Sequence, residues 1–278
     1  HGVTCCAADP QGKWIVSGAF DGTFHFWDVA SGQALRTLEG QRWVNCCAVE
    51  PQGKWIVSGG DEWTLRLWDV ASGQTLRVLE GHTSSVKCCA VDPQGQWVVS
   101  GDHKGTLHLW NVSSGQVLRT LEGHTGGVRC CAVDPQGNWV VSGADDGTLR
   151  LWDVATGQTV CTLEGHTGGV RCCAVGPQGK WIVSGAFDGT VRVWDTDTGR
   201  ALLSLEGHTG KVKCCAVDPQ GKWIVTGDDE STLRLWNVPS GQVMRTLENH
   251  LSGVWCCAVD PHGKWIVSSD DLGTLSLW

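Results

Sequence analysis

The chain has 278 residues, of which 41% are hydrophobic, and it carries a formal net charge of −8. It contains no run of about 18 apolar residues, which excludes a helix that spans a membrane. The acidic balance argues against a general nucleic-acid binder, which would need a basic surface.

Two series of tryptophans divide the sequence into repeats. The tryptophan that closes each copy recurs after 41 residues once and after 42 residues five times, and a second tryptophan lies 13 residues before each of them. The closing tryptophans are Trp27, Trp68, Trp110, Trp152, Trp194, Trp236 and Trp278. A period of this size is typical of architectures in which neighbouring units bury one another's faces. We therefore expect residues 1–278 to form one domain.

Each copy reads as four short strands separated by turn residues. In the fourth copy, the pattern predicts strands at about residues 127–133, 138–143, 148–153 and 158–163. The segment from Asp134 to Gly137 has proline where a tight turn fixes φ and glycine where the chain leaves the turn. Many short, evenly spaced strands favour a propeller over a helical solenoid.

The cysteines are read as small buried hydrophobic residues. Fourteen of the 15 form adjacent pairs such as Cys130-Cys131. Neighbouring residues of a strand face opposite sides, so the two thiols of a pair diverge and resist bridging. The CxxC spacing of a metal site is missing. We expect reduced thiols, no metal and a cytoplasmic setting.

These motifs resemble the WD-repeat β-propeller family over the whole chain. The dipeptide Gly-His precedes four of the seven units, at Gly81-His82, Gly123-His124, Gly165-His166 and Gly207-His208, and most units close with Trp-Asp or Trp-Asn. The resemblance implies an all-β, seven-bladed propeller of four-stranded antiparallel blades. The seventh copy stops after its third strand, so the last blade is expected to lack its own outer strand. We expect a monomer, with room for a neighbouring segment or molecule to pair with that edge.

The resemblance also implies a buried polar network that ties the blades together. Members of the family join a histidine, a Ser or Thr, an Asp and the closing Trp. The complete sets here are His124, Ser142, Asp146 and Trp152, and His166, Ser184, Asp188 and Trp194. A His-Asp pair resembles a catalytic dyad, but its repetition around the ring favours a structural role. The other copies depart from the pattern, for example with Gln41 in place of His and with Lys104 in place of Asp. We expect a break to be destabilising if it leaves a buried donor without a partner.

One end of the blades differs from copy to copy. The turn after the second strand and the connection into the first strand lie at this end, which we call the top face. Aromatic residues gather there on copies seven, one and two: Trp255, Phe20, Trp43 and Trp63. Copies three to six instead carry Lys87, Arg129, Arg171 and Lys213 after the first valine of the first strand, with Asp145, Asp229 and Asp271 close enough to neutralise part of that charge. Aromatic residues and arginine are typical anchors of interfaces, so these eight aromatic and basic residues are the predicted partner-binding set. The alternative is that they are solvated turn residues that differ by drift.

The preferred function is a non-enzymatic scaffold or sensor that binds a protein or peptide, without a cofactor and without nucleic acid or membrane as a partner. The alternative is a recently amplified or engineered symmetric repeat with no selected ligand, which the near-identity of the copies favours. An enzyme is disfavoured because the sequence has no phosphate-cradling glycine loop and no catalytic set outside the structural network.

Overall fold

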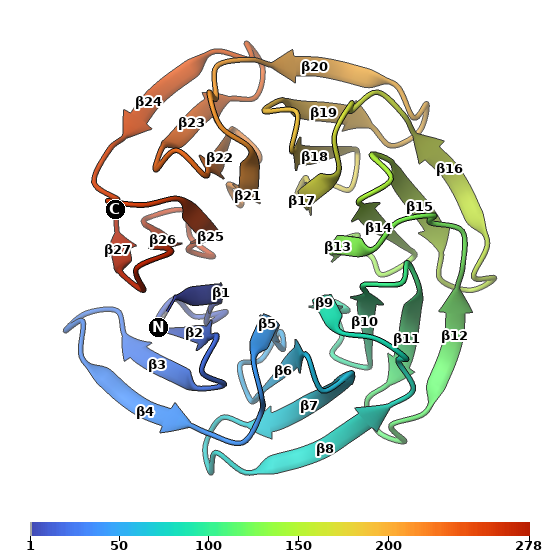
Figure 1. Cartoon of the computed structure of the whole chain (residues 1–278), viewed down its shortest axis with the longest axis vertical. Coiled ribbons are helices and arrows are strands. Elements are labelled where there is room, and N and C mark those ends of the chain that lie inside the picture. The colour runs from blue at the N-terminus through green and yellow to red at the C-terminus, as the bar shows by residue number, and fades with distance from the viewer. Residues whose placement is uncertain (1) are drawn as a thin grey trace.

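Seven small sheets follow one another around a central opening (Figure 1). The computed structural model describes residues 2–278, which form 27 strands and no helix. Six sheets have four strands and the last has three, and consecutive strands pair antiparallel. The predicted seven-bladed propeller with an incomplete last blade is confirmed. We number the blades one to seven in chain order.

The strands of each blade run from the channel outward in sequence order. The innermost strands are β1 (Val3–Ala8), β5 (Val44–Val49), β9 (Val86–Val91), β13 (Val128–Val133), β17 (Val170–Val175), β21 (Val212–Val217) and β25 (Val254–Val259). The second strands are β2 (Trp14–Ala19), β6 (Trp55–Gly60), β10 (Trp97–Asp102), β14 (Trp139–Ala144), β18 (Trp181–Ala186), β22 (Trp223–Asp228) and β26 (Ile266–Asp270).

The third strands are β3 (Phe24–Asp28), β7 (Thr64–Asp69), β11 (Leu107–Asn111), β15 (Leu149–Asp153), β19 (Val191–Asp195), β23 (Leu233–Asn237) and β27 (Leu275–Leu277). The outer strands are β4 (Ala34–Leu38), β8 (Thr75–Glu80), β12 (Val117–Leu121), β16 (Thr159–Leu163), β20 (Ala201–Leu205) and β24 (Val243–Leu247). In blade four, these bounds differ from the predicted ones by about one residue.

The hydrophobic core lies between blades rather than within them. One cluster joins Val99 and Leu121 of blade three to Val128, Val140 and Trp152 of blade four, and all five side chains are buried. Equivalent clusters join the other five pairs of blades that are consecutive in the chain. A single blade would expose these faces to water, so each blade depends on its neighbours for its hydrophobic stabilisation.

Close contact between blades requires glycine in the second strand. A Cβ atom at Gly143 would lie 2.5 Å from Cγ1 of Val170 in the next blade and 2.7 Å from Sγ of Cys130. Blade seven has Ser269 at the equivalent position, with its Oγ 2.9 Å from Sγ of Cys256. The repeated glycine therefore permits each innermost strand to pack directly on the blade before it.

The paired cysteines meet across blade boundaries. The second thiol of each blade contacts the first thiol of the preceding blade, as Cys131 does with Cys88, and at the junction of blades seven and one the Sγ atoms of Cys256 and Cys6 are 2.8 Å apart. The hydrogen bond with Cys88, together with burial, holds the pKa of Cys131 well above its usual range. All 15 cysteines are free thiols.

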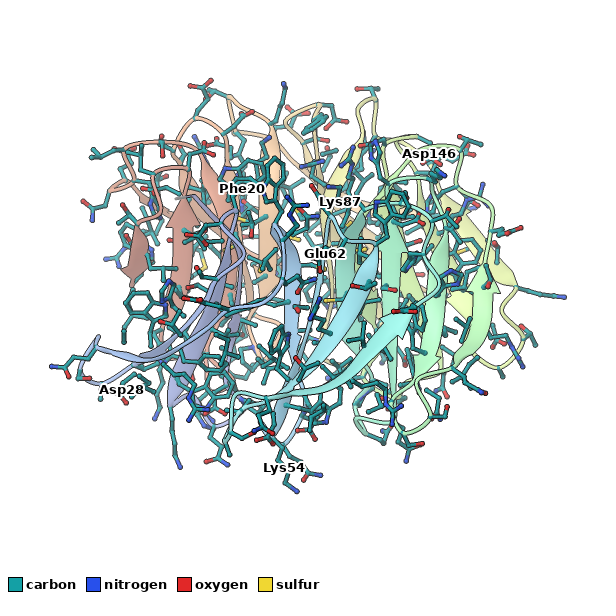
Figure 2. All side chains as sticks on the ribbon, turned by 60° about the horizontal axis from the view of Figure 1, so that its bottom comes forward. Phe20, Asp28, Lys54, Glu62, Lys87 and Asp146 are labelled. Atoms are coloured by element: carbon teal, nitrogen blue, oxygen red, sulfur yellow. The ribbon has the colours of Figure 1, made fainter. Side chains whose placement is uncertain are left out.

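Within residues 2–278 there is no helix of the length and hydrophobicity needed to cross a membrane. The two ends of the blades are distinct surfaces. Figure 2 shows Phe20, Lys87 and Asp146 toward one rim of the ring and Asp28 and Lys54 toward the other. The first rim is the top face defined by the turns that follow the second strands.

Candidate functional site

A β-bulge in the innermost strand of every blade directs one residue to the mouth of the central channel. In blade four, the pairing steps from Val128 opposite Ala144 to Cys130 opposite Gly143, which leaves Arg129 as the extra residue. Bulges re-aim side chains and are frequent beside functional sites. The seven bulged residues, which we call the mouth ring, line one cavity of about 380 Å³: Thr4, Asn45, Lys87, Arg129, Arg171, Lys213 and Trp255.

Three of the four cations of the mouth ring are paired with carboxylates of the top-face turns. The pairs are Lys87 Nζ with Asp61 Oδ1 at 3.2 Å, Arg129 Nε with both oxygens of Asp145 at 2.8 Å, and Lys213 Nζ with Asp229 Oδ2 at 3.9 Å. Asp61 belongs to blade two and Lys87 to blade three, so this pair crosses a blade boundary, and sequence reasoning missed it. Although burial acts to raise it, the pKa of Asp61 is lowered by hydrogen bonds from Ser85 and Asn45.

Arg171 is the exception among the four cations. Its blade has Phe187 where blade four has Asp145, and the guanidinium carbon lies 4.9 Å from the centre of the Phe187 ring. Among the described residues, no carboxylate lies within ion-pair distance of Arg171. Burial, followed by the neighbouring charge of Arg129, lowers the pKa of Arg171, while the charge of Asp145 acts in the opposite direction. The mouth ring thus contains one arginine that forms no ion pair with any described residue.

Three of the predicted aromatic residues form a continuous contact. The ring of Phe20 lies 6.1 Å from that of Trp255 and 6.2 Å from that of Trp43, both in edge-to-face geometry. The indole N–H of Trp255 donates to Asp271, and the Lys213 ammonium lies 5.1 Å from the same indole. The aromatic residues therefore adjoin the basic half of the mouth ring. Trp63 has no ring contact with the other three among the described residues.

Trp43 and Trp63 are exposed and have left-handed backbone conformations. Their side chains are 57% and 53% exposed, with φ of 48° and 64°. The position of Trp63 is occupied by glycine in most blades, as at Gly105 and Gly147. A left-handed backbone costs a non-glycine residue about 1–2 kcal/mol, and such strain concentrates at functional sites.

The polar network of blade four is a continuous chain of hydrogen bonds. The indole N–H of Trp152 donates to Ser142 Oγ at 2.8 Å, and Ser142 Oγ lies 2.8 Å from His124 Nε2. His124 Nδ1 lies 3.0 Å from Asp146 Oδ2. Because Ser142 has a single proton and accepts from Trp152, it donates to Nε2, and the histidine donates from Nδ1 to the carboxylate. Blade five repeats the chain with Trp194, Ser184, His166 and Asp188.

Three of the copies expected to be broken complete the same network from a different position. In blade three, Asp102 at the end of β10 accepts from His82 Nδ1 at 3.1 Å, so Lys104 leaves no gap. Asp102 precedes the position of Asp146 by two residues in the repeat. Asp228 and Asp270 do the same for His208 and His250 in blades six and seven. No histidine donor is orphaned in these blades, so the expected cost does not arise there, because a second position in the turn reaches the histidine.

Blades one and two do depart from this arrangement. In blade two, Ser58 Oγ donates to Gln41 Oε1 at 2.5 Å, and the buried Nε2 of Gln41 has no hydrogen-bond partner among the described residues. In blade one, Trp27 donates to Ser17 Oγ at 2.9 Å, and Asp21 accepts from Thr23. The repeat is thus least regular in the two blades that carry Phe20, Trp43 and Trp63.

The pKa shifts in blade four indicate the charge state of its network. Burial lowers the pKa of His124, although its hydrogen bond with Asp146 acts in the opposite direction. Burial acts to raise the pKa of Asp146, but hydrogen bonds from Thr148 and further donors lower it to about 2. At neutral pH the carboxylate is charged and the imidazole is neutral. The pair is enclosed by protein, which suits a structural link between strands.

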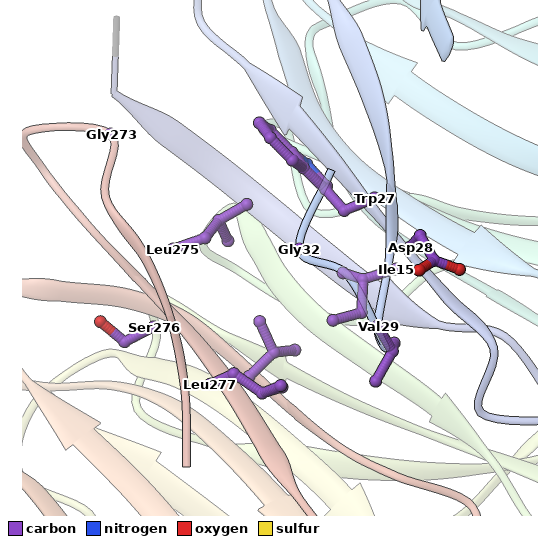
Figure 3. Close-up of a pocket in the computed structure, with 10 residues that line it drawn as sticks. Ile15, Trp27, Asp28, Val29, Gly32, Gly273, Leu275, Ser276 and Leu277 are labelled. Atoms are coloured by element: carbon purple, nitrogen blue, oxygen red, sulfur yellow. The ribbon is translucent and has the colours of Figure 1, made fainter. Parts of the chain in front are cut away.

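The outer edge of blade seven borders a groove. The strand β27 pairs only with β26, and its other side faces Ile15, Trp27 and Val29 of blade one across a cavity of about 240 Å³ (Figure 3). In complete blades, an outer strand occupies this place and contacts the following blade. Arg36 of β4, for example, donates from Nη1 to the carbonyl of Val70 at 3.0 Å.

Comparison with known proteins identifies the repeat. The family model described as WD domain, G-beta repeat matches seven segments: residues 1–28, 32–69, 73–111, 115–153, 157–195, 199–237 and 241–278. No curated protein matches the chain significantly. No cluster of three or more metal-ligating side chains occurs in the described part of the chain.

Proposed function

Because the chain belongs to the WD-domain, G-beta repeat family, we propose that it is a non-enzymatic module that binds a protein or peptide on its top face. Propellers of this family generally serve as scaffolds for protein interactions. The contacts of Phe20 with Trp43 and Trp255 support the top face as the binding surface, because exposed aromatic residues are common anchors of interfaces.

The observation that carries this proposal is the backbone strain at Trp43 and Trp63. Both indoles are about half exposed, so they add little to the core, and both hold the backbone in a region that glycine adopts more easily. Drift alone gives no reason to retain a large apolar side chain at such a position. This argues against the alternative of a symmetric repeat with no selected ligand.

A peptide array compares the wild-type chain with the Trp43→Ala, Trp63→Ala double variant. We expect the wild type to bind a subset of peptides and the double variant to lose at least tenfold in affinity. The matched control is Leu35→Ala with Leu76→Ala, which removes two side chains that are 58% and 55% exposed on outer strands. Equal binding by both double variants would contradict the proposal, and binding of no peptide by the wild type would favour the unselected repeat.

We also infer a cytoplasmic setting, which the 15 unbridged cysteines support because disulfides rarely persist in reducing compartments. Fractionation of cells that express the tagged chain tests this inference. Recovery of the chain in the culture medium with bridged cysteines would contradict it.

A further inference from the structure

The charge of the mouth ring is unevenly neutralised. The residues that line the channel mouth include four cations and no carboxylate. The carboxylates that pair with Lys87, Arg129 and Lys213 belong to the turns around the cavity and do not line it. An anion that entered the mouth would therefore meet cationic side chains first.

Blade five differs from blade four at one decisive position. Both blades place an arginine on the bulge, but the turn residue that faces it is Asp145 in blade four and Phe187 in blade five. Asp145 accepts hydrogen bonds from Nε and Nη2 of Arg129. Phe187 offers Arg171 only the face of its ring. The donors of Arg171 are thus left for a group that is not part of this chain.

Further positive charge surrounds the same phenyl ring. The Nζ atoms of Lys211 and Lys213 lie 5.2 Å and 5.1 Å from the centre of the Phe187 ring. Lys213 is separated from Asp229 by 3.9 Å, which is the longest of the three pairs. Burial and then the charge of Arg171 lower the pKa of Lys213. Three cationic groups thus surround one phenyl ring, and among the described residues Lys213 alone of the three forms an ion pair.

We propose that Arg171 binds the carboxylate of an aspartate or glutamate side chain of a peptide laid across the top face. This inference rests on the proposed function and adds the chemical class of the ligand. One guanidinium without a counter-ion matches one carboxylate, and arginine can bind a carboxylate through two parallel hydrogen bonds. Trp255 and Phe20 line the same cavity, so they can contact apolar residues on either side of the acidic one.

The experiment uses arrays of degenerate nonapeptides with glutamate, glutamine or phosphoserine fixed at the central position. We expect the wild-type chain to select glutamate over glutamine. For the best glutamate peptide, measured by fluorescence anisotropy, Arg171→Gln should weaken binding at least tenfold. Phe187→Asp should do the same, because it gives Arg171 the internal partner that Asp145 gives Arg129. Circular dichroism checks that both variants fold.

The matched control is Arg200→Gln, which removes one positive charge from an exposed turn on the opposite rim. Its affinity should stay within about twofold of wild type, since a distant exposed charge is screened by salt. Equal loss in this variant would overturn the proposal, because it would indicate a general charge effect. Stronger binding of the phosphoserine set than of the glutamate set would overturn the assignment to a single carboxylate.

The two proposals fail in different ways. If the Trp43→Ala, Trp63→Ala variant loses binding while Arg171→Gln and Phe187→Asp bind glutamate peptides as the wild type does, the top face binds peptides and the carboxylate inference is wrong. If no array peptide binds the wild type, both are wrong. If all three variants lose the glutamate peptides and Arg200→Gln does not, both are supported.

Discussion

The aspartate that accepts from the network histidine lies two positions earlier in blade three than in blade four, and two substitutions can move it to the blade-four position. Asp102 is 1% exposed and accepts hydrogen bonds from His82 Nδ1 and from the backbone N–H groups of Lys104 and Thr106. Asp102→Ala leaves the buried His82 donor without an acceptor. An unsatisfied buried donor costs about 1–3 kcal/mol, and with the two turn hydrogen bonds we expect a loss of about 3 kcal/mol in the free energy of unfolding.

Lys104→Asp should restore most of that loss when combined with Asp102→Ala. The double variant has the residues of blade four, Ala144 and Asp146, at the two positions, and Thr106 stands where Thr148 donates to the Asp146 carboxylate. Lys104 is exposed, so its removal costs little by itself. Lys104→Asp alone should be destabilising, because it places a second carboxylate beside Asp102.

Thermal and urea unfolding, followed by tryptophan fluorescence, measure the effect. At about 2 °C per kcal/mol for a chain of this size, Asp102→Ala should lower the Tm by roughly 6 °C, and the double variant should recover more than about half of this shift. If the double variant is no more stable than Asp102→Ala, the two positions are not equivalent, and the explanation of the displaced aspartates is refuted.

Three further outcomes follow from the structure. Trp63→Gly should raise the free energy of unfolding by about 1 kcal/mol in urea denaturation, because glycine adopts the left-handed backbone without strain; a loss of stability would show that the indole is a packing residue. Burial and the neighbouring His82 lower the pKa of His108 to about 4 from 6.5, so the unfolded chain binds the proton first and stability falls as the pH drops from about 6.5 to about 4. His108→Ser should flatten this fall in denaturation at pH 7 and pH 4.5, and an unchanged slope would contradict that assignment. A peptide with the sequence of residues 117–125 should pair with β27 and, at 100 times its Kd, stabilise the chain by about 2.7 kcal/mol. The same peptide with glutamate in place of Leu121, a buried residue in blade three, should not stabilise it. Equal effects of the two peptides would exclude the edge of β27 as the binding site.

The fold could be predicted from the sequence because the tryptophan period and the turn residues repeat with little variation. The position of the cations could be predicted as well, since each follows the first valine of its innermost strand. The pattern does not reveal the β-bulge, because the register shift is a property of the pairing between two strands and not of the sequence of one strand. The sequence therefore placed Arg129 and Arg171 on the top face but did not show that one cavity collects them.

The buried polar network is a second feature that could not be fully predicted from the sequence. Column-by-column comparison of the copies treats Lys104 as a missing aspartate, because it compares equivalent positions only. In three dimensions the turn folds back, so a carboxylate at Asp102 reaches the histidine as well as one at Asp146. The pair of Lys87 with Asp61 was missed for a similar reason, since it joins residues of different copies.

The thiol contacts between blades bear on how the circle is closed. Blades seven and one are the only neighbours that no segment within residues 2–278 links directly, and at their seam the Sγ atoms of Cys6 and Cys256 are 2.8 Å apart. If glutathione disulfide took two electrons and two protons from these thiols, the resulting crosslink would join the ends of a 250-residue span. Opening of the ring at that seam, the one junction that no connecting segment within residues 2–278 tethers, would then require reduction first.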